Sequence, residues 1–274
     1  MRGLPEMTEN PGSGDILGGD ATLPGHSPDG KWTPGRGPSN GSPVTRRIGH
    51  KGADAIAPGN TLASFVAAVE AGVDMIEFDV LPQNTDGGGE LFLAHDYEHL
   101  EGAITLREGL EHLAATGVDL LVDLKRTGYE DRVVAALRQH GLLERVVVTT
   151  MEPRSLAVLR KLEPGLAIGQ SVPRIKRDYL AHKATRLLAR LPLYYLRGAL
   201  PRRMAKAIAA GKIDAVSAHA SVVTPRFVRA VHLAGGQIYV WTVDDRRDIG
   251  RFTAMDVDGI ITDDPRLFDD AGGR

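Results

Sequence analysis

The chain of 274 residues contains no cysteine, which excludes disulfide bonds, thiolate zinc sites and a cysteine nucleophile. An excess of one charge is also lacking, since 33 Lys and Arg stand against 35 Asp and Glu, so this is not a polycation that coats nucleic acid. No uncharged apolar run approaches the ~18 residues that a membrane span needs, and the N-terminus lacks the apolar stretch of a signal peptide. We therefore expect a soluble protein of the cytoplasm, and any metal must be held by oxygen or imidazole ligands.

Residues 1–43 form a segment of unusual composition, with 10 Gly and 7 Pro and almost no periodic apolar residues. Such a segment cannot bury enough apolar surface to offset the entropy of ordering, so it is predicted to be a flexible tail. The chain as a whole is 42% hydrophobic and 25% charged, as in ordinary globular proteins. Residues 44–274 are accordingly predicted to form the folded domain.

In this domain, short β-branched runs alternate with apolar residues at helical spacing. Eight such units in about 230 residues predict an α/β fold of the closed (β/α)8 type, a TIM barrel. The competing open doubly wound sheet would need a G-x-G-x-x-G turn after its first strand, and the sequence has none. The predicted strands are 47–50, 75–80, 120–124, 146–150, 166–171, 215–219, 237–242 and 259–262.

The stretch 174–212, after the fifth predicted strand, is longer than one helix requires and carries 11 basic residues against the single acid Asp178. Leucine and tyrosine residues are interleaved with the charges, so we predict a basic helical insertion. It is too short and too charged to span a bilayer. Two interpretations stay open: an amphipathic flap that contacts an anionic membrane from the periphery and presents lipid-derived phosphodiesters, or a barrel helix with a solvated basic face.

Two carboxylates mark the second predicted strand. Period-two alternation places Glu77 and Asp79 on one face and apolar residues on the other, so both acids should point into the barrel mouth. Neighbouring carboxylates repel each other unless a cation lies between them. That cation is either a hard divalent ion, Mg²⁺ or Ca²⁺, or an Arg or Lys from the next strand.

The third predicted strand repeats the arrangement, because Asp123 and Lys125 share one face. Asp123 is the third candidate metal ligand. Lys125 cannot bind a metal, but its point charge can hold an anionic substrate.

Two histidines occur where barrel enzymes carry their catalytic groups. His50 and Lys51 follow the first strand between two glycines that would let a ligand approach the backbone, and His95 follows an extended arm, 91–93, after a Gly-rich turn. His50 and His95 are predicted to flank one substrate as general base and general acid.

These residues occur in an ordered set of motifs that resembles the glycerophosphodiester phosphodiesterase family. The resemblance covers 47 to about 268 and implies a TIM barrel that hydrolyses glycerophosphodiesters to glycerol 3-phosphate and an alcohol with a divalent metal ion. The motifs are Gly-His-Lys-Gly at 49–52, Ala-Pro-Gly-Asn-Thr at 57–61, Gly-Val-Asp-Met-Ile-Glu-Phe-Asp-Val at 72–80, His-Asp at 95–96, Asp-Leu-Lys at 123–125, Val-Trp-Thr-Val at 240–243 and Asp-Gly-Ile-Ile-Thr-Asp-Asp-Pro at 258–265.

The resemblance also implies a role for each matching residue. His50 and His95 correspond to the acid–base pair, and Lys125 to the lysine that contacts the phosphate. In this family a free glycerol hydroxyl of the substrate attacks phosphorus, and water then opens the cyclic phosphate. The implied metal ligands are Glu77, Asp79 and Asp123.

One aromatic residue belongs to the implied site. Trp241 shares a strand face with Tyr239, so its indole either walls the substrate site or packs within the barrel.

Three positions depart from the family pattern. Lys51 stands where arginine is usual, which keeps the charge but loses the bidentate fork on phosphate. Gly59 stands in place of a glutamate, and Asp123 replaces a glutamate with a shorter side chain. The reduced set of acids also resembles the related sphingomyelinase D-like phospholipases, so lysophospholipase D or sphingomyelinase D-like activity on lysolipids is the alternative enzyme. A barrel that binds phosphodiesters without catalysis is the alternative from another class.

Overall fold

The computed structural model describes residues 45–173 and 190–269. The predicted tail, and residues 174–189 of the predicted insertion, lie outside this part of the chain. The strands are β1 (Arg46–Gly49), β2 (Met75–Pro82), β3 (Leu91–Leu93), β4 (Asp119–Leu124), β5 (Val146–Thr150), β6 (Ala167–Val172), β7 (Ala215–His219), β8 (Gln237–Trp241) and β9 (Gly259–Thr262). The helices are α1 (Leu62–Glu70), α2 (Leu106–Ala114), α3 (Glu130–Gln139), α4 (Pro153–Leu162), α5 (Arg190–Ala209), α6 (Pro225–Leu233) and α7 (Arg246–Thr253). Short 3-10 turns η1 (Tyr97–His99), η2 (Leu143–Arg145) and η3 (Pro265–Phe268) complete the set.

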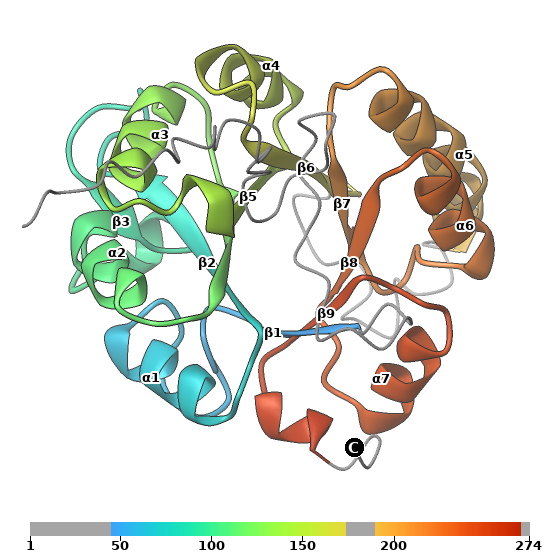
Figure 1. Cartoon of the computed structure of the whole chain (residues 1–274), viewed down its shortest axis with the longest axis horizontal. Coiled ribbons are helices and arrows are strands. Elements are labelled where there is room, and N and C mark those ends of the chain that lie inside the picture. Colours follow the sequence, from blue (N-terminus) through green and yellow to red (C-terminus); the bar gives the residue numbers. More distant parts are fainter. Residues whose placement is uncertain (1–44, 174–189, 270–274) are drawn as a thin grey trace, which may run out of the picture.

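The strands close into a barrel. Parallel pairing runs from β1 through β9, β8, β7, β6, β5 and β4 to β2, and β1 pairs with β2 to complete the ring. Figure 1 shows this ring of strands with the helices around it. Strand β3 is the exception, since it pairs antiparallel with the end of β2 as the extended arm of the prediction. The fold is therefore the predicted TIM barrel, with all eight predicted strands present.

The apolar residues form two layers. The larger layer lies between the strands and the surrounding helices and includes Ile76, Phe78 and Val80 of β2, as the alternation predicts. The smaller layer fills the barrel interior, where large branched side chains leave no pore. Its members are Ile48, Met75, Leu121, Val147, Ala167, Ala215, Tyr239 and Ile261, with Trp241 packed against them.

Along each strand the inward-facing residues change from apolar to polar. On β2 the inward series is Met75, Glu77 and Asp79, and on β4 Leu121 is followed by Asp123. The apolar members stabilise the bottom of the barrel, and the polar members gather at the carboxyl ends of the strands, where barrel enzymes carry their active sites.

Helix α1 begins directly after the loop that follows β1. Its N-terminus is fixed by a capping box, in which the Thr61 side chain accepts from the Ser64 backbone N–H and the Ser64 side chain accepts from Thr61 N–H. Such caps contribute about 1 kcal/mol. The Ser64 hydroxyl also donates to Lys51 O at 2.7 Å, so the cap anchors the loop that carries His50 and Lys51.

Helix α5 is the described half of the basic stretch. It packs beside α6 and buries Leu200, Met204 and Ile208 against the barrel. Residues 190–209 thus serve as a covering helix of the barrel. None of the helices within the described ranges has the length and apolar character needed to cross a membrane.

Candidate active site

Three buried carboxylates lie inside the barrel near the carboxyl ends of β2 and β4. Asp79 and Asp123 are direct partners in the register of these two strands, and Glu77 lies two residues before Asp79 on the same face. The exposed fraction of each whole residue is below 9%. The structure therefore brings the three predicted metal ligands to one end of the barrel.

Lys125 neutralises two of these acids. Its Nζ lies 2.5 Å from Asp79 Oδ1 and 2.8 Å from Asp123 Oδ2. Burial acts to lower the pKa of Lys125, but Asp123, Asp79 and Glu77 outweigh it and raise that pKa. Burial likewise acts to raise the pKa of Asp79, but the ammonium of Lys125 and the contact with His95 hold it well below its usual range. Of the pair Glu77 and Asp79, for which the sequence left open a metal ion or a basic residue of the next strand, Asp79 is thus paired with a lysine.

Glu77 has a different environment. Its Oε2 accepts the backbone N–H of Lys51 at 3.0 Å and lies 3.8 Å from His50 Nε2. In the described part of the chain no ammonium group pairs with this carboxylate. Burial, together with the nearby charge of Asp79, raises the pKa of Glu77 to about 7. Glu77 is thus the carboxylate whose charge the protein itself compensates least.

His50 is held by Asp263, a residue near the C-terminal end of the domain. Its Nδ1 lies 2.5 Å from Asp263 Oδ1, and its backbone N–H donates to Thr262 O, because β1 pairs with β9 as the barrel closes. Burial acts to lower the pKa of His50, but Glu77 and Asp263 outweigh it and raise that pKa. The ring is fixed through Nδ1, and Nε2 is directed toward Glu77.

His95 contacts Asp79, the acid next to Glu77 on the inward face of β2. Its Nδ1 lies 3.2 Å from Asp79 Oδ2, and 55% of its side chain is exposed. Asn60 supports this contact, because its amide donates to Asp79 Oδ2 at 3.1 Å while its carbonyl accepts from Asp79 N–H. His50 and His95 thus contact the adjacent acids Glu77 and Asp79, one histidine on each.

Hydroxyl groups complete the hydrogen bonding of Asp123. Thr149 on β5 and Ser171 on β6 donate to its Oδ1 at 3.0 and 3.1 Å. One carboxylate oxygen of Asp123 therefore accepts from hydroxyls, and the other faces Lys125. The side chain is therefore held by groups from β5 and β6 and by Lys125, the residue after β4.

Trp241 lies at the end of β8, packed against the apolar interior of the barrel. It makes an edge-to-face contact with His219 at the end of β7, with ring centroids 5.0 Å apart. His219 Nδ1 accepts the backbone N–H of Ser221 at 3.1 Å, which places the proton of the neutral ring on Nε2. The two predicted interpretations of Trp241 are thus compatible, since its indole packs inward at the rim.

The glycines that flank His50 and Lys51 serve to pack the loop. A Cβ at Gly49 would clash with Gly52 O, and Gly52 has a φ of +91° and lies against Ser64. Close packing of the loop onto itself and onto α1 therefore accounts for both glycines, and the approach of a ligand to the backbone stays a prediction.

Several contacts of the site were not predicted from the sequence. Asp263 and Asn60 belong to recognised motifs. Nothing in the motifs indicates that Asp263 is the partner of His50, or that Asn60 is the hydrogen-bond partner of Asp79. His219 could have been found, because it continues the inward series of β7 at the carboxyl end of the strand. No pattern in the sequence pointed to Asp54, which lies within the loop after β1.

In the described ranges, the group of metal-binding atoms that lie within 4.8 Å of one another comes from His50, Asp54 and Asp263, and not from Glu77, Asp79 and Asp123.

The carboxyl end of the barrel thus gathers acids, histidines and lysines, groups that suit an enzyme moving protons on an anionic substrate. The sequence model of the Glycerophosphoryl diester phosphodiesterase family matches residues 50–114 and 114–267. The chain belongs to this family and is an enzyme of the phosphoric diester hydrolase class.

Two curated relatives span almost the same region. The glycerophosphodiester phosphodiesterase of Caldanaerobacter subterraneus is 26% identical over 255 residues, which cover 80% of this chain and 93% of that protein. The glycerophosphodiester phosphodiesterase of Bacillus altitudinis is 24% identical over 260 residues, which cover 81% of this chain and 96% of that protein.

Solved structures share the fold. A glycerophosphodiester phosphodiesterase from Parabacteroides distasonis superposes with a TM-score of 0.64 at 18% identity, covering 81% of this chain and 94% of that one. A phosphodiesterase from Oleispira antarctica, solved in complex with the product sn-glycerol-3-phosphate, gives a TM-score of 0.63 at 20% identity, covering 83% and 96%. At these identities the likeness is one of fold.

Proposed function

We propose that this protein hydrolyses glycerophosphodiesters to glycerol 3-phosphate and an alcohol at the carboxyl ends of β1, β2 and β4. The observation that carries the proposal is the placement of His50 and His95 on the adjacent acids Glu77 and Asp79, with Lys125 beside Asp79. Membership of the family and the product complex of the Oleispira antarctica relative support the choice of substrate.

The two histidines move the protons. Each ring is held through Nδ1, His50 by Asp263 and His95 by Asp79, so each has Nε2 available for proton transfer. One histidine accepts the proton of the attacking glycerol hydroxyl, and the other donates a proton to the leaving alcohol oxygen as the bond to phosphorus breaks. In the second step the roles reverse, and water opens the cyclic phosphate to glycerol 3-phosphate.

Lys51 and Lys125 supply positive charge for the phosphate. Both ammonium groups lie at the rim, and the acids around them raise their pKa values above the ordinary range despite burial, which acts to lower them. Both therefore stay protonated at neutral pH and can offset the charge that develops on the phosphoryl oxygens. Trp241 forms a wall of the same site.

The residues present fit a divalent cation, Mg²⁺ or Ca²⁺. Three buried carboxylates face the single ammonium of Lys125, and burial together with the nearby charge of Asp79 raises the pKa of Glu77 to about 7. Glu77, Asp79 and Asp123 would hold the ion through the oxygen ligands that hard cations prefer. When bound, it would polarise the phosphoryl oxygens.

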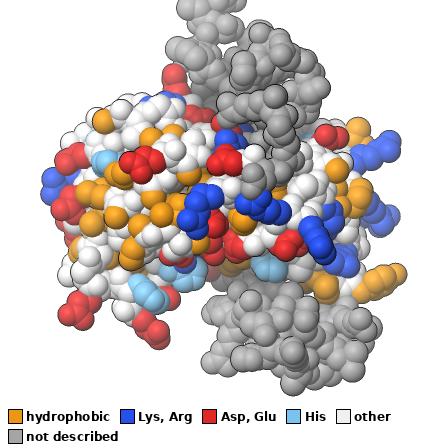
Figure 2. All heavy atoms as spheres, turned by 90° about the horizontal axis from the view of Figure 1, so that it is seen from below, with side chains coloured by type: hydrophobic (Ala, Val, Ile, Leu, Met, Phe, Trp, Pro, Cys, Tyr) orange, Lys and Arg blue, Asp and Glu red, His pale blue; other side chains and the backbone are white. Residues whose placement is uncertain are grey.

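A peripheral membrane contact is the remaining part of the proposal. Tyr194 and Tyr195 in the first half of α5 are 81% and 72% exposed. Arg202, Arg203 and Lys206 further along the same helix are exposed as well. Figure 2, turned to look from below Figure 1, shows Lys and Arg side chains interspersed with acidic and apolar ones. These exposed aromatic and basic groups suit an anionic lipid surface, from which lipid-derived phosphodiesters would reach the barrel mouth.

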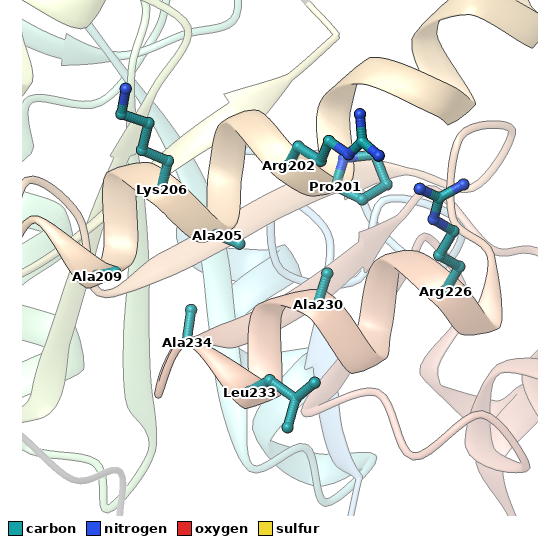
Figure 3. Close-up of a pocket in the computed structure, with 9 residues that line it drawn as sticks. All are labelled: Pro201, Arg202, Ala205, Lys206, Ala209, Arg226, Ala230, Leu233 and Ala234. Atoms are coloured by element: carbon teal, nitrogen blue, oxygen red, sulfur yellow. The ribbon is translucent and has the colours of Figure 1, made fainter.

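A groove between α5 and α6 belongs to the same surface. Its volume is about 510 Å³, and alanines such as Ala205 and Ala230 form its floor, with Arg202, Lys206 and Arg226 at its edges (Figure 3). We expect vesicles of anionic lipid to bind the protein at low salt and to release it at high salt. Equal binding to neutral vesicles would contradict this contact.

The activity is tested by release of glycerol 3-phosphate from a panel of glycerophosphodiesters and lysolipids, with and without chelator. We expect release from glycerophosphodiesters, loss of activity with chelator, and a fall of about 10²-fold or more in turnover for His50→Ala and for His95→Ala. Turnover of lysolipids alone would favour the sphingomyelinase D-like alternative, which the carboxylate missing at Gly59 suggests. Binding without turnover would favour a non-catalytic barrel.

A further inference from the structure

Asp54 holds both ends of the loop that follows β1. Its Oδ1 accepts the backbone N–H of Gly59 at 2.8 Å, and its Oδ2 lies 3.2 Å from Lys51 Nζ. Its carboxylate also lies beside His50 and Asp263, since one metal-binding atom from each of the three lies within 4.8 Å of the other two. Asp54 is therefore placed at the rim of the proposed active site.

The same carboxylate explains the glycine at position 59. A Cβ on Gly59 would lie 2.7 Å from Asp54 Oδ1 and 2.8 Å from Lys51 Cβ, closer than real side chains approach. Gly59 is not among the glycines with positive φ, so its backbone conformation does not require glycine. The space that a side chain at position 59 would enter is filled by the Asp54 carboxylate and by Lys51 Cβ.

The ammonium group of Lys51 needs a carboxylate partner to hold it in place. Lysine carries its charge on a flexible four-carbon stem, so an unpaired ammonium is poorly placed for a phosphate. The Lys51 backbone has a φ of +49° and is fixed by the bond from its N–H to Glu77 Oε2. Asp54 is the carboxylate in hydrogen-bonding distance of the Lys51 ammonium.

We propose that Asp54 is a positioning residue for Lys51, and that it takes the place of the glutamate that the family motif has at position 59. The inference rests on the proposed function in that Lys51 is taken to contact the substrate phosphate. A Cβ at position 59 would lie 2.8 Å from Lys51 Cβ as well as 2.7 Å from Asp54 Oδ1, so a glutamate there could pair with the Lys51 ammonium once Asp54 is removed and the loop shifts away from Lys51 Cβ. The carboxylate that pairs with the residue at position 51 would thus come from position 54 in this chain, and from position 59 in proteins that have the glutamate of the family motif.

The first test separates the charge of Asp54 from its role in the loop. Asp54→Asn keeps an oxygen that can accept from Gly59 N–H but removes the ion pair with Lys51. We expect KM to rise about tenfold with a smaller change in kcat, and Asp54→Glu to recover part of the loss. Asp86→Asn is the matched control, because Asp86 Oδ1 likewise accepts a glycine N–H at 2.8 Å, from Gly88, without contacting a lysine. Unchanged KM in Asp54→Asn would overturn the proposal.

The second test is a double-mutant cycle. Gly59→Glu alone should lower both the melting temperature and the activity, because its side chain meets both Asp54 and Lys51 Cβ. Asp54→Ala combined with Gly59→Glu should be at least about tenfold more active than the product of the two single effects predicts. Additive effects of the two substitutions would show that Asp54 only holds the loop together. They would contradict the proposal that Asp54 takes the place of a glutamate at position 59.

A binding measurement distinguishes failure of this inference from failure of the proposed function. Inorganic phosphate is titrated into each variant and followed by calorimetry, which requires no turnover. If the wild type releases no glycerol 3-phosphate, the proposed function fails, while weaker phosphate binding in Asp54→Asn and its recovery in the double variant would still support the inference. Equal phosphate binding in wild type and Asp54→Asn would contradict it.

Discussion

Asp79 and Asp123 lie directly opposite each other on β2 and β4 and share one ammonium group, with Lys125 Nζ 2.5 Å from the first and 2.8 Å from the second. Two adjacent buried carboxylates are thereby stabilised by a residue of the same strand end. Among the residues that the structure describes, no ammonium group forms an ion pair with the third acid, Glu77. This division predicts that a cation and Lys125 compete for the same carboxylates.

Replacing Lys125 tests that competition. Lys125→Met keeps the length of the side chain but leaves two buried carboxylates uncompensated, which costs several kcal/mol in proteins. We expect a lower melting temperature without added cation, and a larger rise on addition of Mg²⁺ or Ca²⁺ than in the wild type. Turnover should fall by about 10²-fold or more, because the phosphate loses its charge partner.

The control for this variant is Lys161→Met, which removes an exposed lysine from the last turn of α4. Thermal unfolding is measured for both variants over a series of cation concentrations. If Lys125→Met gains no more stability from the cation than the control does, the ion is not held by Asp79 and Asp123.

The orientation of His50 can be tested through Asp263. Asp263 contributes to the raised pKa of His50, against the burial that acts to lower it. Asp263→Asn should therefore lower the pKa of His50 and reduce turnover by at least about tenfold, because the ring loses its partner at Nδ1. The pKa is followed by NMR of the ring carbons.

The exposed Asp269, from the same C-terminal segment, supplies the control Asp269→Asn. An unchanged titration of His50 in Asp263→Asn, with wild-type turnover, would remove Asp263 from the mechanism.

The strands and their inward faces were predictable because they depend on local pattern. Buried β-branched runs fix the strands, and period-two alternation alone places Glu77, Asp79 and Asp123 inside the barrel. The contact of His50 with Asp263 depends instead on closure of the barrel, which joins residues 213 positions apart in the sequence. Local patterns carry no information about such a contact.

Other features of the site depend on how single side chains fill space. The long side chain of Lys125 could reach a substrate or an acid, and only the packed barrel shows it between Asp79 and Asp123. Asp54 lies in a loop with no periodicity, and its relation to Gly59 follows from the fold of that loop. Sequence patterns find the residues of a site more readily than they find the partners of those residues.

Glu77 should make cation binding depend on pH. Burial and the charge of Asp79 raise its pKa to about 7, so below that pH a proton competes with the ion. We expect the affinity for Mg²⁺ or Ca²⁺ to fall by about tenfold per pH unit below pH 7, with release of about one proton per ion bound. Calorimetry in two buffers of different ionisation enthalpy measures that proton.

Glu77→Gln is the matching variant, because the amide oxygen can still accept from Lys51 N–H. It should bind cation weakly at every pH and lose activity by about 10²-fold or more. Full wild-type activity in excess chelator, or cation binding in Glu77→Gln that still rises with pH, would contradict the assignment of Glu77 as a ligand.

A contact remote from the site should make stability itself depend on pH. His232 on α6 has its Nε2 2.9 Å from Asp258 Oδ2, and the same Asp258 oxygen accepts the N–H of Ile238 at the start of β8. The hydrogen bond to Asp258 raises the pKa of His232, although burial opposes the shift. A group whose folded pKa is raised stabilises the fold fully below its unfolded pKa, near 6.5, and this contribution is lost as the pH rises through the folded pKa.

Removal of His232 should therefore cost more stability at low pH than at high pH. For His232→Ala, the decrease in the free energy of unfolding should be about 0.5 kcal/mol larger at pH 5.5 than at pH 8.5, a modest value because the pair is partly exposed. Urea unfolding at the two pH values measures the difference, with His112→Ala on α2 as the control. The same loss of stability at both pH values would show that His232 contributes only packing, whereas the predicted difference requires its charge to act on Asp258 and thus on the junction of α6 and β8.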